Sequence, residues 1–537
     1  MNTILKRRLY NSFYQDYILQ KSAAHQFIDS PHQLAWDQLI PRLNLDSDRY
    51  QYIRTVLINQ NKDLHSPKAE NYLDFLQSQQ SVIIVTGQQL GLFASPLYTI
   101  YKIASTIKLT ESLNSQTQKY KFIPVFWLES EDHDFQEVNH IGVQDNNFLP
   151  KHYVYDGEDR GKVSLRHYLL ESSISSFLSE VKGNLLNTEF SNELFEKLNN
   201  FYKPGRKWTM AIRDFLQELF HPYGLLFFQP GENEVKELSV DFFIQFLNNL
   251  KTLRSSFEQK SGQLLSAGFH NQVKNIAGQT FVHMEQEHKQ REHLYVDGES
   301  YFFKKSPQKY HLDEVIAKIK ENPSSVSSTV VSRPLLQSWL LPVAAYIAGP
   351  GEIAYWAQLS QMFKEMDLVM PVLYPRISAT LIEPKVARYM EKYSLNLEEI
   401  PLSSNLFIEQ YFKQLNENAG QNPLRNLDKM LIEESAKVEA YIKAVDPTLV
   451  DMASKSLERM RQTISNLEGR LVKAQEQRQS QLTNHLKQLH ASIYPNGIPQ
   501  ERFQSIIYFL NKFGPEILDR IVMELEINTF DHQLLYL

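Results

Sequence analysis

Acidic and imidazole side chains crowd together directly after one apolar stretch of the sequence. The run FIPVFWL at 122–128 is followed by Glu129, Glu131, Asp132, His133, Asp134, Glu137 and His140. Carboxylates and imidazoles at this density can transfer protons, bind an amine or a hydroxyl-rich substrate, or hold a divalent ion. The spacing matches no zinc signature such as HExxH, so we predict no metal ion. A solvated loop that leads into a capped helix is the simplest alternative.

A second polar stretch is SVIIVTGQQLGLFASPLYTIYK at 81–102. An apolar run enters a loop with two glycines, and Ser95 and Pro96 are expected to cap and begin a helix. Free N–H groups in such a loop and helix N-terminus can bind an anion. The loop is neither a Walker A loop nor a GxGxxG turn, and an ordinary strand–helix joint is the alternative. The candidate anion- or substrate-binding residues are Gln88, Gln89, Ser95 and Tyr98.

A third stretch, PVAAYIAGPGEIAYWAQL at 342–359, breaks at Gly349-Pro350-Gly351 before a predicted helix. Glu352 lies in the first turn of that helix, where it either complements the helix dipole or faces the same crevice as the other polar stretches. The candidate binding residues here are Tyr346, Gly349, Gly351 and Glu352.

Two arginines lie beside prolines, Arg333 before Pro334 and Arg376 after Pro375. A guanidinium held in this way can bind a carboxylate or phosphate through two hydrogen bonds. A surface ion pair is the alternative for each of them. We take both as candidate anion-binding residues.

The elements that must position these side chains are strands alternating with helices. Five short apolar runs are predicted as buried strands: 82–86, 122–128, 225–229, 343–348 and 370–373. Helical patterns between them favour an α/β fold with a parallel sheet. Residues about 150–205 and 255–330 are longer than a crossover needs and are interpreted as insertions. The polar stretches follow strands, so we expect them to share a crevice at the carboxyl edge of the sheet.

The sequence after residue 384 has a different pattern. Leu457, Met460, Ile464, Leu467 and Leu471 recur at three- and four-residue steps, and a similar seam precedes Asp446-Pro447. This predicts a helical hairpin with coiled-coil packing, whose second helix has about 44 residues. Such a long seam favours a homodimer. We therefore predict a core at 1–384, a helical domain at 385–492, and a segment at 493–537 that packs back on the core.

Composition excludes several classes of protein. The chain has 537 residues, a formal net charge of −6 and no cysteine. The charge is unlike that of a nucleic-acid binder, and without cysteine there is no disulfide or protein thiolate chemistry. The N-terminus has no apolar signal-like region, and no apolar run approaches the length of a membrane span. We expect a cytoplasmic protein that contacts neither nucleic acid nor membrane.

Taken together, VTGQQLGLFASPLYTIYK, PVFWLESEDHDFQEVNH, RPLLQSWLLPVAAYIAGPGEIAYWAQL and PVLYPRISATLIE resemble the BshC family of bacillithiol biosynthesis. The resemblance runs through most of the chain and is most specific at 82–143 and 329–383. It implies a Rossmann-like core with connecting-peptide insertions and a dimeric coiled coil. It also implies the last step of bacillithiol synthesis, in which L-cysteine is joined through an amide bond to the amine of glucosaminyl malate.

This reaction suggests roles for the candidate residues. Glu131, His133 and Asp134 are the candidate catalytic residues, with His133 or Asp134 helping to deprotonate the amine. Asp132 and Asn139 would bind substrate beside them, and Arg333 would hold a malate carboxylate. Activation of the cysteine carboxyl suggests ATP or another nucleotide. The alternatives are another ATP-dependent ligase or nucleotidyltransferase acting on a small acid, or a non-catalytic dimeric scaffold that binds a metabolite.

Overall fold

The structure is a computed structural model that describes residues 2–4, 10–32, 36–43, 45, 48–77, 80–417 and 423–537. It divides into two units, one made of residues 1–382 and 499–537 and the other of residues 383–498. In the described helices, no stretch is both long and apolar enough to cross a membrane.

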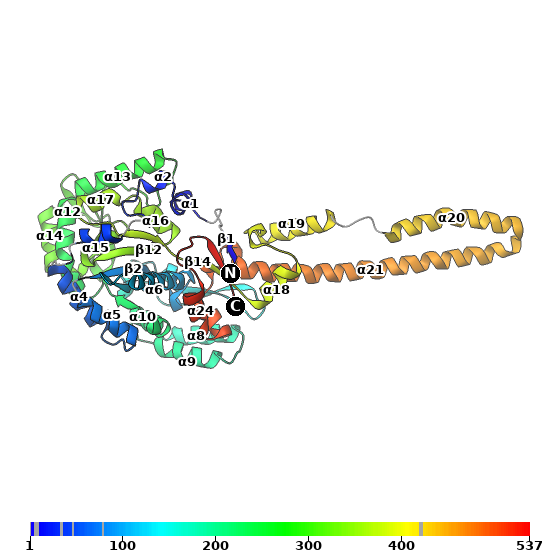
Figure 1. The fold of residues 1–537 in the computed structure, drawn as a ribbon, viewed down its shortest axis with the longest axis horizontal. Coiled ribbons are helices and arrows are strands. Elements are labelled where there is room, and N and C mark those ends of the chain that lie inside the picture. Colours follow the sequence, from blue (N-terminus) through cyan, green and yellow to red (C-terminus); the bar gives the residue numbers. More distant parts are fainter. Residues whose placement is uncertain are drawn as a thin grey trace. The chain divides into compact units, whose positions relative to one another are not determined.

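The first unit is built on a five-stranded sheet with the order β13-β12-β2-β3-β6 (Figure 1). The strands are β2 (Ser81–Gln89), β3 (Lys121–Glu129), β6 (Leu226–Phe228), β12 (Val343–Ala348) and β13 (Val372–Pro375). Every neighbouring pair is parallel. The predicted parallel α/β sheet is confirmed. The last strand begins two residues later than the apolar run at 370–373 indicated, and the carbonyl of the buried Met370 accepts from the Ser30 hydroxyl at 2.7 Å.

Side chains alternate between two cores along these strands, as the two-residue period of a strand requires. Val82 and Ile84 belong to one core, and Ile83 and Val85 belong to the other. Burial on both faces explains why the strands are continuously apolar. The first core also takes residues from α6 (Tyr98–Gln116), α8 (Ser173–Asn184), α9 (Ser191–Phe201), α10 (Trp208–Phe220), α23 (Ile506–Phe513) and α24 (Glu516–Glu524).

The opposite core is filled by helices from the N-terminal part and the middle of the chain. They are α1 (Ser12–Ile18), α4 (Asp48–Asn61), α5 (Pro67–Leu76), α12 (Val240–Asn248), α13 (Leu250–Ser266), α14 (Leu312–Glu321), α15 (Arg333–Leu340), α16 (Pro350–Trp356) and α17 (Ser360–Glu365). Shorter helices are α2 (Ser22–His25), α3 (Trp36–Leu39), α7 (Phe135–Val138), α11 (Asn233–Leu238) and α22 (Gln500–Phe503).

The insertion predicted at about 255–330 contains a second sheet that the sequence pattern did not reveal. It is antiparallel, with the order β10-β9-β8-β7-β11. Its strands are β7 (Gln279–Glu285), β8 (Arg291–Asp297), β9 (Ser300–Phe302), β10 (Lys309–Tyr310) and β11 (Val326–Ser328). These strands are short and carry polar residues, so they lack the continuous apolar signature of the central sheet.

Two small sheets complete the first unit. One has the order β1 (Asn2–Ile4), β15 (His532–Tyr536) and β14 (Ser378–Ile382), and the other pairs β4 (His140–Gln144) with β5 (Pro150–Val154). The C-terminal segment from residue 499 thus returns to the first unit. It lies against the start of α6, where Leu97 N–H donates to Gln504 O at 2.8 Å.

The second unit is helical and contains α18 (Pro384–Lys392), α19 (Ser404–Glu417), α20 (Pro423–Val445) and α21 (Val450–Ile493). The predicted hairpin is confirmed, because α20 and α21 pack against each other and α21 has 44 residues. Asp446 caps a 3-10 turn at Pro447–Leu449, accepting from Thr448 N–H at 2.9 Å. It does not cap α21 itself, which begins one turn later.

Candidate active site

A polar cavity of about 470 Å³ opens at the carboxyl ends of the central strands. Its wall combines residues that follow β2, β3, β12 and β13 with residues from the second sheet and from α15. The expected site residues that line it are Gln88, Gln89, Tyr98, Asp132, His133, Arg333, Tyr346, Gly349, Gly351, Glu352 and Arg376. Topology explains the convergence, because parallel strands bring their carboxyl ends to the same edge of the sheet.

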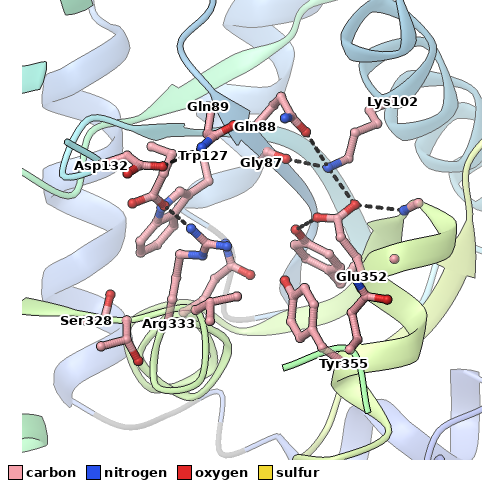
Figure 2. A pocket seen from close by; sticks show the side chains of 18 of the residues that line it. Gly87, Gln88, Gln89, Lys102, Trp127, Asp132, Ser328, Arg333, Glu352 and Tyr355 are labelled. Carbon is pink, nitrogen blue, oxygen red and sulfur yellow. Dashed lines mark hydrogen bonds and ion pairs between the residues drawn. The ribbon is translucent and has the colours of Figure 1, made fainter. Parts of the chain in front are cut away.

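A buried lysine connects the end of β2 with the start of α16 on one side of the cavity. Lys102, on α6, is 1% exposed, and its Nζ lies 2.7 Å from Glu352 Oε2. The same ammonium donates to Gly87 O and to Gln88 Oε1, the latter at 3.2 Å. Figure 2 shows Lys102 and Glu352 pointing toward each other.

Glu352 is further held by Tyr346 and by the backbone of the preceding turn. The Tyr346 hydroxyl donates to Glu352 Oε1, and Gly349 N–H donates to Oε2 at 2.8 Å. Burial alone would raise the pKa of Glu352, but the charge and hydrogen bond of Lys102 outweigh it and lower that pKa. Glu352 is therefore a carboxylate that closes its own helix cap and neutralises Lys102.

On the opposite side of the cavity, Arg333 binds the last residue of β3. Arg333 Nη1 lies 3.0 Å from Glu129 Oε2, and Trp127 Nε1–H donates to the same oxygen at 3.1 Å. Figure 2 shows the side chains of Arg333 and Trp127 close together, as their shared bond to one Glu129 oxygen requires. Arg333 is the first residue of α15, so one guanidinium joins that helix to the central sheet.

Asp132 faces the cavity as a carboxylate. It accepts from Gln89 Nε2–H at 2.7 Å and from His133 N–H at 2.7 Å. Burial raises the pKa of Asp132, but the Gln89 hydrogen bond and the charge of Arg291 bring it below its usual value. Gln89 also donates to Glu137.

His133 lies beside Arg291 of β8, which the second sheet brings to the cavity. Arg291 Nη1 lies 3.2 Å from His133 Nδ1. A guanidinium only donates, so Nδ1 accepts and the neutral ring carries its proton on Nε2. Burial, followed by the charge of Arg291, lowers the pKa of His133 and keeps the ring neutral at pH 7. In this state His133 offers an N–H donor.

Glu131, Asp134, Asn139 and Ser95 do not line the cavity. The Glu131 carboxylate is buried against the ammonium of Lys236, with Arg166 Nη1 at 3.9 Å. Asp134 is exposed and caps α7 by accepting from Glu137 N–H at 3.2 Å. Asn139 donates to Tyr155 O at 3.3 Å, inside the protein.

The structure contradicts the expectation that Ser95 caps a helix. Helix α6 begins at Tyr98 after Leu97, with no side-chain cap. The Ser95 hydroxyl instead donates to Ser505 Oγ at 2.7 Å and so binds the C-terminal segment. The physical reason is burial: Ser95 is 7% exposed and is covered by that segment.

The loop after β2 has its amides occupied by the protein itself. The N–H groups of Gly91, Ala94 and Ser95 donate to backbone carbonyls at 3.0, 3.1 and 3.0 Å. Phe93 N–H donates to the Tyr202 hydroxyl at 3.1 Å. These four amides are not available to cradle a phosphate.

Arg376 is held in an ion pair with the C-terminal segment. Its Nη1 and Nη2 lie 2.9 and 2.7 Å from the two carboxylate oxygens of Glu501, and both side chains are buried. Burial raises the pKa of Glu501, but Arg376 outweighs it and lowers that pKa to about 2. Arg376 therefore contacts the cavity with its two terminal nitrogens already bonded.

No group of three or more His, Asp or Glu side chains within the described ranges is arranged to hold a metal ion. The acids of the 129–137 stretch are engaged with Arg333, Lys236, Gln89 and a helix N-terminus, as described above.

Family models match the chain from end to end. The N-terminal Rossmann-like domain of bacillithiol biosynthesis BshC matches residues 2–377, and the C-terminal coiled-coil domain of BshC matches residues 379–537. This chain belongs to the BshC family.

The curated relatives are similar over almost their whole length. Proteins named "Putative cysteine ligase BshC" include one from Bacillus licheniformis, 26% identical over 95% of this chain and 95% of the relative. Another, from Prosthecochloris aestuarii, is 29% identical over 94% of this chain and 92% of the relative. A third, from Chloroherpeton thalassium, is 27% identical over 99% of this chain and 95% of the relative.

Sequence reasoning missed several side chains that line the cavity of this BshC family member. They are Lys102, Trp127, Gln272, His283, Arg291, Gln337, Tyr355 and Arg502. One signal was available for Lys102, which places a charge near the start of the helix that follows the candidate loop. Arg291, His283 and Arg502 come from the second sheet and the C-terminal segment, and no local pattern connects those segments to the cavity.

Proposed function

We propose that this chain is a ligase that joins the carboxyl of L-cysteine to the amine of glucosaminyl malate, the last step of bacillithiol biosynthesis. The observation that carries the proposal is a polar cavity, rich in buried acids and cations, at the strand ends of a chain matched throughout by BshC models. We also propose a cytoplasmic location, in keeping with a small-molecule thiol pathway.

The reaction forms one C–N bond, breaks a C–O bond of the activated cysteine carboxyl, and removes a proton from the attacking amine. The amine reacts only after its ammonium form has lost a proton. Of the acids in the 129–137 stretch, Asp132 is a cavity-lining carboxylate and suits contact with this amine. His133 would donate from Nε2 to an oxygen of the reacting carboxyl, since its Nδ1 already accepts from Arg291.

We propose Arg333 as a contact for a substrate carboxylate. Its Nη1 is bound to Glu129, and the residue lines the cavity beside Tyr355. The acids around Asp132 and the amides of Gln88 and Gln89 would bind the sugar hydroxyls and the amine. Glu352 and Tyr346 would keep Lys102 and the strand ends in place for this binding.

Activation of a free carboxylate needs an energy source, for which we propose ATP or another nucleotide. The loop after β2 does not fit a phosphate cradle, because its amides at 91 and 93–95 are bonded within the protein. We therefore assign no residue to the nucleotide and derive no step through it.

The deciding experiment incubates purified protein with cysteine and glucosaminyl malate, with and without ATP, and detects the thiol product by mass. A product larger than glucosaminyl malate by one cysteine residue supports the ligase. A product in the ATP run alone supports the nucleotide. Tight binding of glucosaminyl malate without product in either run would favour a metabolite-binding scaffold and contradict the proposal.

We also propose that the chain is a homodimer through its helical hairpin. The hairpin exposes apolar side chains along both helices, including Tyr441 at 73%, Met460 at 55% and Leu467 at 53%. A second copy of the same hairpin would bury them.

A further inference from the structure

Most cations that line the cavity are already bound by the protein. Lys102 pairs with Glu352 at 2.7 Å, and Arg333 pairs with Glu129 at 3.0 Å. Arg376 is bonded through both terminal nitrogens to Glu501. All three nitrogens of the Arg291 guanidinium are used, on Ser327 Oγ, Ser328 O and His133 Nδ1.

Arg502 is different. Its side chain is exposed, lines the same cavity, and forms no hydrogen bond or ion pair with the residues that the structure describes. The adjacent Glu501 forms no hydrogen bond with Arg502 among the described residues, because Arg376 occupies both oxygens of that carboxylate and Ser378 Oγ donates to one of them at 2.9 Å. The cavity rim therefore carries a guanidinium with all its donors open.

Tyr98 supplies a second open donor beside it. The Tyr98 hydroxyl accepts from Gln88 Nε2–H at 3.2 Å, and its own proton has no acceptor among the described residues. Burial raises the pKa of Tyr98, so the phenol keeps this proton. The positive charge of Arg502 partly opposes this rise in the pKa of Tyr98, as expected for two side chains that line the same cavity.

The C-terminal segment is fixed where it brings these two donors together. Ser95 Oγ donates to Ser505 Oγ at 2.7 Å, and Leu97 N–H donates to Gln504 O at 2.8 Å. Arg502 lies two residues before Gln504, and Tyr98 directly follows Leu97. A rigid attachment of this kind limits the entropy lost when a ligand binds.

We propose that Arg502 and the Tyr98 hydroxyl bind a carboxylate of the acid-bearing substrate, which under the proposed function is the malate group. The open N–H and O–H donors of Arg502 and Tyr98 suit a ligand group that only accepts hydrogen bonds, such as a carboxylate or a phosphate. The two carboxylates of malate give Arg333 and Arg502 one partner each. Arg376 then acts as a positioning residue, because it holds Glu501 and the helix that carries Arg502.

The test measures the Kd of L-malate, glucosaminyl malate and inorganic phosphate by calorimetry for the full chain and its variants. Arg502→Gln is expected to weaken binding of both malate ligands by at least about tenfold, the usual effect of losing a charged hydrogen bond. Tyr98→Phe is expected to weaken it by about three-fold. The matched control is Arg388→Gln, since Arg388 is also exposed but lies outside the cavity, and among the described residues its side chain donates only to Pro384 O of its own helix.

A steady-state measurement separates recognition from folding. In Arg502→Gln the KM for glucosaminyl malate should rise while the KM for cysteine stays unchanged, and Arg502→Lys should restore part of the affinity. Equal malate affinity in Arg502→Gln and the unaltered protein would overturn the inference, as would no binding of either malate ligand to the unaltered protein. Phosphate binding tighter than malate binding, and lost in the same variant, would identify a phosphate site instead.

These outcomes are distinct from those that test the ligase. If malate binds and Arg502→Gln weakens it, but no thiol product forms, the inference stands and the proposed function fails. If product forms at the same KM in Arg502→Gln, the proposed function stands and the inference fails.

Discussion

Lys102 and Glu352, 250 positions apart in the sequence, form an ion pair of 2.7 Å in the cavity wall. The pair joins α6, which follows β2, to α16, which follows β12. Because Lys102 also donates to Gly87 O, a single ammonium holds the end of β2 and the start of α16 together. The shape of this side of the cavity therefore depends on two charges that neutralise each other.

Loss of this lysine should destabilise the first unit. Lys102→Met leaves Glu352 largely buried without its countercharge, and we expect the free energy of unfolding to fall by about 3–5 kcal/mol. Urea denaturation followed by tryptophan fluorescence measures the change. In the double variant Lys102→Met/Glu352→Gln, the free energy of unfolding should fall by less than the sum of the losses in the two single variants, because no charge is left unpaired. A loss below about 1 kcal/mol in Lys102→Met would show that the pair contributes little.

Two aspartates two residues apart should differ in their effect on turnover. Asp132→Asn removes the carboxylate that lines the cavity, and kcat/KM should fall by about 100-fold or more, as for loss of a group that assists proton transfer. Asp134→Asn alters a helix cap outside the cavity, and its main effect should be a stability loss of about 1 kcal/mol or less. Steady-state kinetics of both variants, with denaturation curves, tests this assignment. The opposite order of kcat/KM would identify Asp134 as the catalytic residue.

The Arg376–Glu501 pair predicts a specific dependence of stability on pH. The pKa of Glu501 is about 2 in the folded protein, below its ordinary value of 4.5. The stability that the ionised Glu501 contributes is therefore fully present above pH 4.5 and is lost as the pH falls from 4.5 toward 2. Glu501→Gln should be less stable than the unaltered protein by about 3 kcal/mol at pH 7, and the difference should shrink as the pH falls below 4.5.

Urea denaturation at pH 7, 4.5 and 3 measures this difference. Glu524→Gln is the matched control, because Glu524 forms an exposed pair with Arg520. Its substitution should lower the free energy of unfolding by less than about 1 kcal/mol. A Glu501→Gln difference that is the same at all three pH values would contradict the assigned ionisation.

The proposed dimer predicts a clear effect of charge on the hairpin. Sedimentation at micromolar concentration should show a dimer for the unaltered chain and a monomer for Met460→Glu/Leu467→Glu, because two buried carboxylates would oppose association. Leu265→Glu, on α13 of the first unit, is the control, since Leu265 is 57% exposed and lies outside the hairpin. A monomeric unaltered chain would refute the dimer.

Local patterns in the sequence were enough to predict the main elements. The run at 343–348 is β12, the parallel order of the central strands follows from strands alternating with helices, and the heptad-like seam is the hairpin of α20 and α21. These features depend on which face of a short segment is buried, and the period of apolar residues records that directly. The same logic placed the polar stretches at one edge of the sheet, where 11 of the expected site residues line the cavity.

Only the tertiary structure decided which charges meet. Arg376 looked like a free clamp beside its proline, yet it binds Glu501, 125 residues away. Arg291 reaches His133 because a second sheet, hidden in an insertion, folds beside the central one. An arginine has no local preference for one carboxylate over another, so its partner is chosen by the packing of distant segments. The sequence alone determined the scaffold and the sheet edge at which the candidate residues gather, while the fold decided which of their side chains are bound within the protein.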